Sequence, residues 1–172
     1  RSAAITIIPS HCSGLSRMGG SVHRPGLLST GDANGIVEET ASEVLPLLQA
    51  TPVLAGINGT DPFRLAPVFL RQLKEMGFSG VQNFPTVGLI DGNFRANLEA
   101  TGMGYAKEVE WIRIAHELDL LTAPTVFAGH DARAKATGGA DLVGRQVGRA
   151  TRAPTGAGSR ARRAARRPRA AR

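Results

Sequence analysis

The sequence is poor in several features that would place it in a defined class. It holds one cysteine, Cys12, among 172 residues, so no intrachain disulfide can form and a thiolate zinc site would lack a second sulfur ligand. No apolar run approaches the roughly 18 residues that a membrane-spanning helix requires, and the run at residues 3–8 is too short for a signal peptide. We therefore expect a protein of the reducing cytoplasm that contains no membrane span.

Acidic residues are absent from positions 145–172, although ten of the 21 basic residues lie there. The remaining eleven basic residues face fourteen acidic ones, a net charge of −3. The formal charge of +7 and the high isoelectric point therefore describe mainly an arginine-rich tail. This tail lacks aromatic residues and any nucleic-acid recognition motif, so we expect it to bind nucleic acid only non-specifically, through its charge.

Apolar runs alternate with amphipathic segments over most of the chain. Strands are predicted at residues 3–8, 53–57, 80–84 and 121–127, and residues 138–143 resemble the start of a fifth. Helices are predicted at residues 33–48, with Asp32 as the N-cap, after Asp61-Pro62 as far as Met76, over residues 105–115, and after Asp131. Residues 89–104 are predicted to form a loop. Strands that alternate with helices indicate an α/β fold with a parallel sheet.

The alternation is compatible with an open sheet or with a closed (β/α)8 barrel, because both place ligands at the carboxyl ends of the strands. No Gly-x-Gly-x-x-Gly motif follows the first strand, and no Gly-Lys-Ser/Thr motif occurs, which disfavours the nucleotide-binding open sheets. A barrel needs eight strands and about 250 residues. With about five βα units, the chain is predicted to form part of a TIM barrel.

Several consecutive motifs resemble one known family. They are Gly31-Asp-Ala-Asn34, Thr51-Pro-Val-Leu-Ala-Gly56, Gly59-Thr-Asp-Pro-Phe-Arg64, Gly77-Phe-Ser-Gly-Val-Gln-Asn-Phe-Pro-Thr-Val-Gly-Leu-Ile-Asp-Gly92, Phe94-Arg95, Asn97-Leu-Glu99 and Thr101-Gly-Met-Gly-Tyr105. This set resembles the phosphoenolpyruvate hydrolase-like TIM-barrel family, which is similar to phosphonopyruvate hydrolases. The same family recurs in the C-terminal half of certain plant ATP-binding virus-resistance proteins. The resemblance covers roughly residues 13–143 and implies a (β/α)8 barrel.

Two regions depart from the family's pattern. Leu15 stands where the family has an arginine, and after Val143 the sequence consists mainly of Arg, Ala, Gly and Pro. We therefore divide the chain into a partial TIM-barrel domain at residues 1–143 and a disordered Arg/Ala-rich tail at 144–172. The expectation is a barrel fragment that lacks strands at both ends.

Two aspartates are the predicted catalytic and metal-binding residues. Asp61 lies just beyond a strand end, where a carboxylate can hold a divalent cation or accept a proton, or can simply cap the helix before Pro62. Asp91, in Leu-Ile-Asp-Gly, has no helix to cap in the next residue, so a ligand role and a turn role both remain open. The cation that the resemblance implies is Mg²⁺.

Six further residues are predicted to bind substrate. Asn83 and Thr86 flank Phe84-Pro85 at a strand end, where they either bind a ligand oxygen or satisfy the backbone around Pro85. Arg95 is the best candidate for binding a carboxylate or phosphate, the alternative being a solvated helix charge. The other three, Ser13, Gly14 and Arg17, follow the first strand, where backbone N–H groups and a guanidinium can approach an anion.

The resemblance implies an enzyme that acts on a small phosphorylated or phosphonate oxyacid, by C–P or P–O bond cleavage through a metal-stabilised enolate. Two alternatives remain open: a non-catalytic barrel that binds a ligand or partner, and an inactive fragment. A folded chain is expected to form a homo-oligomer, since a partial barrel leaves strand edges unpaired.

Overall fold

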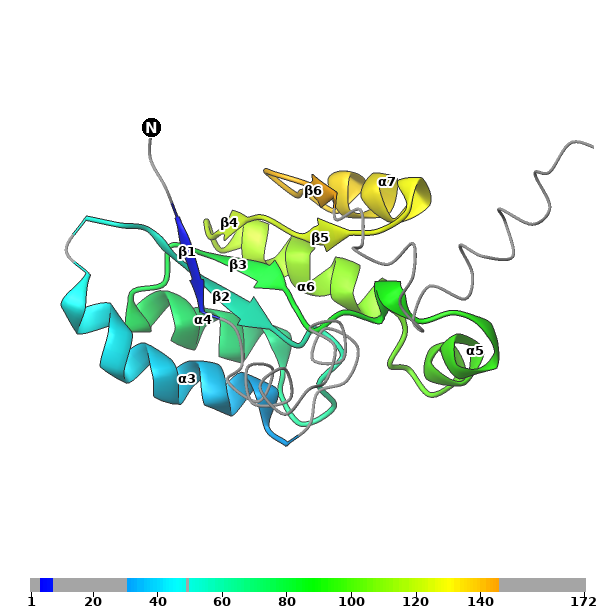
Figure 1. Cartoon of the computed structure of the whole chain (residues 1–172), viewed down its shortest axis with the longest axis horizontal. Coiled ribbons are helices and arrows are strands. Elements are labelled where there is room, and N and C mark those ends of the chain that lie inside the picture. Colours follow the sequence, from blue (N-terminus) through cyan, green and yellow to red (C-terminus); the bar gives the residue numbers. More distant parts are fainter. Residues whose placement is uncertain (1–3, 8–30, 49, 146–172) are drawn as a thin grey trace, which may run out of the picture.

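The structure, a computed structural model, describes residues 4–7, 31–48 and 50–145 (Figure 1). Its main sheet consists of four parallel strands in the order β1-β2-β3-β4, which is also their order along the chain. The strands span Ile5–Ile7 (β1), Val53–Ile57 (β2), Gly80–Asn83 (β3) and Leu121–Thr122 (β4). The parallel α/β fold predicted from the sequence is confirmed at this level.

Three helices cover one face of this sheet. They are α3 (Ala33–Val44), which a short 3-10 turn at Leu45–Leu47 extends, α4 (Ala66–Met76) and α6 (Tyr105–Glu117). Alternate residues of β2, namely Val53, Ala55 and Ile57, join the apolar faces of the helices in one core cluster. Burying a large apolar side chain contributes about 1.5–3 kcal/mol, so this cluster is the main source of stability.

Two predicted helix boundaries are correct for the expected reasons. The Asp32 carboxylate accepts a hydrogen bond from Gly35 N at 2.9 Å and caps α3. Gly77 ends α4 with φ of 103°, a left-handed conformation that favours glycine.

Two predicted N-caps are wrong. Helix α4 begins at Ala66 and not at Pro62, so Asp61 does not cap it, and Phe63 lies 93% exposed in the loop before it. The last described helix, α7, spans Gly129–Thr137 and begins before Asp131, which is buried in its first turn. The Asp61 side chain instead contacts Asn34 and Arg64, whereas the Asp131 carboxylate lies 3.3 Å from Nε2 of the neighbouring His130.

The predicted strand at residues 121–127 is divided. Leu121–Thr122 pairs with β3, whereas β5 (Thr125–Val126) pairs with β6 (Gly144–Arg145) in a separate two-stranded sheet. Pro124 lies between the two segments and has no N–H to donate to a ladder, so the pairing breaks there. The fifth predicted strand thus forms at residues 144–145 rather than within 138–143. These two residues belong to the range 144–172 that was predicted to be a disordered tail, so the tail prediction is wrong for them. The rest of that range, 146–172, lies outside the described residues.

The predicted loop at residues 89–104 contains a helix, α5 (Gly92–Ala100), after a 3-10 turn at Val87–Leu89. None of its nine residues is buried, and it stands apart from the sheet (Figure 1). Without a buried face the segment has no apolar periodicity, which is why the sequence did not predict it. Among the described residues, no helix is long and apolar enough to cross a membrane.

Candidate functional site

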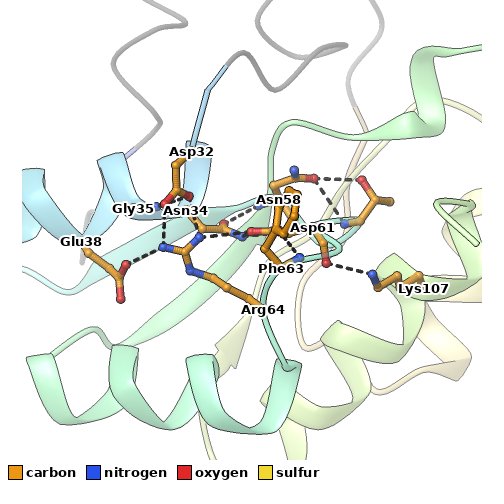
Figure 2. A network of polar contacts seen from close by, with 10 residues as sticks. Asp32, Asn34, Gly35, Glu38, Asn58, Asp61, Phe63, Arg64 and Lys107 are labelled. Carbon is orange, nitrogen blue, oxygen red and sulfur yellow. Dashed lines mark hydrogen bonds and ion pairs between the residues drawn. The ribbon is translucent and has the colours of Figure 1, made fainter.

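The loop after β2 is fixed to helix α3 by one buried asparagine. The Asn34 side chain donates to Asn58 O at 3.2 Å and to Asp61 Oδ2 at 2.8 Å, while its Oδ1 accepts from Asn58 N at 2.8 Å (Figure 2). Both ends of the Asn34 amide are therefore satisfied, and the loop is held in one conformation at the carboxyl end of β2.

Asp61 is 6% exposed and lies at the centre of this loop. Its Oδ1 accepts from Phe63 N at 2.8 Å, and its Oδ2 faces both Asn34 and the Arg64 guanidinium, the latter at 3.3 Å. Three hydrogen bonds from three directions fix the carboxylate. A carboxylate has about four acceptor positions, so one on Oδ1 remains for a further donor.

Arg64 is the cationic centre of the same cluster. Besides Asp61, it contacts the carboxylate of Asp32 through two bonds of 2.5 and 3.0 Å and that of Glu38 at 2.9 Å. The hydrogen bonds that Arg64 donates to Asp32 hold the pKa of Asp32 below its usual value, and the same bonds raise the pKa of Arg64. Arg64 therefore joins the loop after β2 to two positions of α3.

Helix α6 adjoins the same loop. A Cβ added at Gly59 would lie 3.2 Å from Glu108 Cα, so a larger residue would fit only if the loop or the helix shifted by a few tenths of an ångström. The Lys107 ammonium donates to Asp61 O at 2.8 Å (Figure 2). The carboxyl end of β2 and the start of α6 thus form one continuous polar region.

A second polar cluster lies at the carboxyl end of β3, around the buried carboxylate of Glu108. Its Oε2 accepts from Asn83 Nδ2 at 2.7 Å and from Thr86 Oγ1 at 2.8 Å, and its Oε1 accepts from Val87 N at 2.7 Å. The Lys135 ammonium, also fully buried, approaches Oε2 at 3.3 Å. Glu108 therefore organises the whole segment that follows β3.

Lys135 is held between a carboxylate and an aromatic ring. Its Nζ lies 4.8 Å from the centroid of the Tyr105 ring, and Cζ of Arg95 lies 5.4 Å from the same centroid. Burial lowers the pKa of Lys135, an effect that the neighbouring Glu108 charge opposes.

The structure brings Asn83 and Thr86 into contact, with Asn83 Nδ2 3.3 Å from Thr86 Oγ1, and engages their polar atoms within the protein. Besides the bonds to Glu108, Asn83 Oδ1 accepts from Thr125 N at 2.8 Å and Thr86 Oγ1 accepts from Gly88 N at 3.1 Å. The sequence left two roles open for these residues, ligand binding and a structural role. This geometry fits the structural role, in which the side chains accept hydrogen bonds from nearby backbone N–H groups. Substrate binding by either residue stays a prediction.

Arg95 and Asp91 lie on or beside α5. The Arg95 guanidinium contacts Glu99 at 2.5 Å and Val87 O at 2.9 Å, so it is partly buried rather than solvated. Asp91 immediately precedes α5, contrary to the expectation that no helix follows, but its exposed side chain forms no capping bond. The remaining predicted residues, Ser13, Gly14 and Arg17, lie outside the described residues.

The described side chains do not by themselves fit a divalent cation. In residues 4–7, 31–48 and 50–145, no group of three or more His, Cys, Asp or Glu is placed to hold a metal ion. Oδ2 of Asp61 already faces the positive charge of Arg64. Mg²⁺ binding by Asp61 and Asp91 therefore stays a prediction.

Sequence reasoning missed five residues of the two clusters: Asn34, Arg64, Lys107, Glu108 and Lys135. One signal was available. Tyr105, Ile112 and Ala115 share the buried face of α6, and Glu108 occupies the position between them at the same helical spacing. A carboxylate on an apolar face needs a buried partner. The partner's identity was not readable, because Lys135 lies 27 residues away.

The family described as phosphoenolpyruvate hydrolase-like matches residues 2–166. Over 153 residues, 89% of this chain, the sequence is 52% identical to the ToMV resistance protein Tm-1(GCR237) of Solanum lycopersicum, and equally to the ToMV susceptible protein tm-1(GCR26) of the same species. It is 38% identical over 114 residues to the uncharacterized protein y4oT of Sinorhizobium fredii. The aligned region covers 65% of this chain and 55% of y4oT. The chain spans about one fifth of the length of the tomato relatives.

Proposed function

Because the chain belongs to the phosphoenolpyruvate hydrolase-like family, we propose that it supplies active-site residues of an enzyme that hydrolyses a small phosphorylated or phosphonate oxyacid. The site lies at the carboxyl ends of β2 and β3. Ligands of parallel α/β proteins bind at this end of the strands.

The barrel is part of this proposal. The four strands of the main sheet are neighbours in chain order, and the helices that form its core lie on one face. Doubly wound sheets instead reverse their strand order and carry helices on both faces. The observed winding supports a segment of a (β/α)8 barrel whose remaining strands would complete the wall.

The observation that carries the proposal is the fixed, buried carboxylate of Asp61. Its three partners hold it in one orientation, and its remaining acceptor position on Oδ1 suits a water molecule. A general base must lie within hydrogen-bond distance of the proton that it removes, and a preorganised carboxylate meets this condition without reorganisation.

In the proposed reaction Asp61 accepts a proton from water as the water oxygen attacks phosphorus. The P–O bond of phosphoenolpyruvate, or the C–P bond of phosphonopyruvate, breaks, and its electron pair leaves with the enolate of pyruvate. Solvent water then protonates the enolate carbon, and Asp61 releases its proton to solvent, which gives pyruvate and phosphate. A divalent cation, which the family implies, would stabilise the enolate, but it would need ligands beyond the described residues or a displaced Arg64.

The test is release of phosphate and pyruvate from phosphoenolpyruvate and phosphonopyruvate, with Mg²⁺ present. Asp61→Asn should reduce the rate by about 100-fold or more, the contribution of a positioned general base. Asp119→Asn is the matched control, because Asp119 is exposed before β4, at the opposite end of the strands. Its φ of 65° suits asparagine. If the unmodified chain releases neither product, the hydrolase proposal is wrong.

A second candidate is a non-catalytic binding module, supported by the tomato relatives, whose names refer to virus resistance and susceptibility and to no reaction. Binding of phosphoenolpyruvate without product release, at an affinity that Asp61→Asn leaves unchanged, would favour this candidate. Loss of turnover with retained affinity in Asp61→Asn would favour the enzyme.

A further inference from the structure

Lys107 differs from the other cations around the two clusters in the partner that it contacts. Its ammonium is half-buried and donates to the backbone carbonyl of Asp61 at 2.8 Å. An ammonium has three N–H donors and no acceptor. Among the described residues, Lys107 forms no ion pair with any carboxylate.

The three other cations near the loops after β2 and β3 are each matched by carboxylates. Arg64 faces Asp32, Glu38 and Asp61, Arg95 pairs with Glu99, and Lys135 pairs with Glu108. An incoming anion would have to displace one of these partners. At Lys107 it would replace only the hydrogen bond to a neutral carbonyl, or add to it.

The excess negative charge of the Arg64 cluster lies on the side away from Lys107. Asp32 and Glu38 project from α3 on one side of Arg64, and Lys107 approaches Asp61 from the opposite side (Figure 2). The side chains of Asp32 and Glu38 are 59% and 30% exposed, so water and salt screen their charges. The two carboxylates next to Lys107 in the structure, those of Asp61 and Glu108, are paired with Arg64 and Lys135. The N-terminal end of α6, in whose first turn Lys107 lies, adds a partial positive charge.

We propose that Lys107 binds the phosphoryl or phosphonate group of the substrate. The inference rests on the proposed function and assigns its anion-binding residue. An ammonium at this position holds phosphorus next to Asp61, the residue proposed to activate the attacking water. It also neutralises charge on the phosphoryl oxygens, which Arg64, Arg95 and Lys135 cannot do without losing a carboxylate partner.

The test uses the full chain and three probes: phosphoenolpyruvate, inorganic phosphate and pyruvate, with binding measured by calorimetry. Lys107→Met should weaken binding of the first two by about tenfold or more, the effect of losing one charge-assisted hydrogen bond. It should leave pyruvate, which lacks the phosphoryl group, unaffected. Lys107→Arg should retain most of the affinity.

Lys74→Met is the matched control. Lys74 also donates to a backbone carbonyl, Leu118 O at 2.6 Å, but it lies in the last turn of α4 and therefore at the amino end of the strands. Its removal should change no probe's affinity. This comparison separates loss of a carbonyl contact from loss of an anion ligand.

The outcomes distinguish the two proposals. Unchanged phosphate affinity in Lys107→Met would overturn the inference, and product release by the unmodified chain would then leave the proposed function intact. Equal weakening of phosphoenolpyruvate and pyruvate binding would assign Lys107 to the carboxylate instead and overturn the phosphoryl assignment. Phosphate binding that depends on Lys107 in a chain that releases no product would keep the inference and remove the hydrolase. Failure of the unmodified chain to bind either phosphate probe would overturn the inference.

Discussion

The carboxylate of Glu108 and the ammonium of Lys135 lie 3.3 Å apart in the protein interior, with exposed fractions of 1% and 0%. The pair joins α6 to α7, and the other hydrogen bonds of Glu108 hold the segment after β3. Removing one member of a buried pair leaves the other as an uncompensated charge, which is strongly unfavourable.

Glu108→Gln should therefore lower the free energy of unfolding by about 3–5 kcal/mol, because Lys135 remains buried without its counter-ion. The double variant Glu108→Gln/Lys135→Met should be less destabilised than the sum of the single variants. Urea unfolding of the four proteins measures the coupling. Additive effects would show that the pair does not act as a unit.

Arg64→Met should lower the free energy of unfolding by about 1–2 kcal/mol, mainly because the buried carboxylate of Asp61 loses its cation. The contributions of Asp32 and Glu38 are smaller, because solvent screens exposed pairs. Urea unfolding measures the loss, and Arg71→Met is the control, since Arg71 is exposed and, within the described part of the chain, hydrogen-bonds only to Pro67 O. Equal losses in the two variants would contradict a special role for Arg64.

The free energy of unfolding at acidic pH should depend on the carboxylate of Asp141. The backbone hydrogen bond from Thr122 is the main cause that holds the pKa of Asp141 below its ordinary value of 3.8. A carboxylate with a depressed pKa in the folded state stabilises the protein above its unfolded pKa, and this stability is lost as the pH falls through the folded pKa.

Asp141→Asn should accordingly be less stable than the unmodified chain at pH 6, and the difference should shrink as the pH falls below 3.8. Unfolding free energies at a series of pH values between 3 and 6 check this. A difference that does not change with pH would mean that the Asp141 charge contributes nothing to stability.

Deleting residues 146–172 should abolish binding to DNA. The segment carries nine of the ten arginines of the basic end and no acidic residue, so counterion release is the expected driving force. Binding to a duplex of arbitrary sequence should weaken steeply between 50 and 200 mM salt and vanish in the shortened chain. Retained binding after deletion would place the contact elsewhere.

The unmodified chain should associate in solution. In the described sheet, β1 pairs only with β2 and β4 only with β3, which leaves an edge on each side. Apolar side chains such as Leu47, Phe63, Leu65 and Leu142 are also exposed. Light scattering should give a mass above the 18.0 kDa of one chain. A monomer at every concentration tested would contradict this.

The sequence by itself determined the parallel α/β fold and most of the element order. Apolar runs such as residues 53–57, the cap at Asp32 and the stop at Gly77 act over a few residues, so local rules are sufficient to predict them. The sequence also placed Asp61, Asn83 and Thr86 at strand ends, because the position after a strand follows from the strand itself.

The tertiary structure decided which of these side chains form hydrogen bonds or ion pairs, and with which partners. Asp61 meets Asn34 across 27 positions, and Glu108 meets Asn83 across 25, so no local pattern encodes either contact. The charge state and availability of a side chain depend on burial and on partners brought from other elements. For that reason the sequence did not identify five residues of the two polar clusters, whose roles follow from tertiary contacts: Asn34, Arg64, Lys107, Glu108 and Lys135.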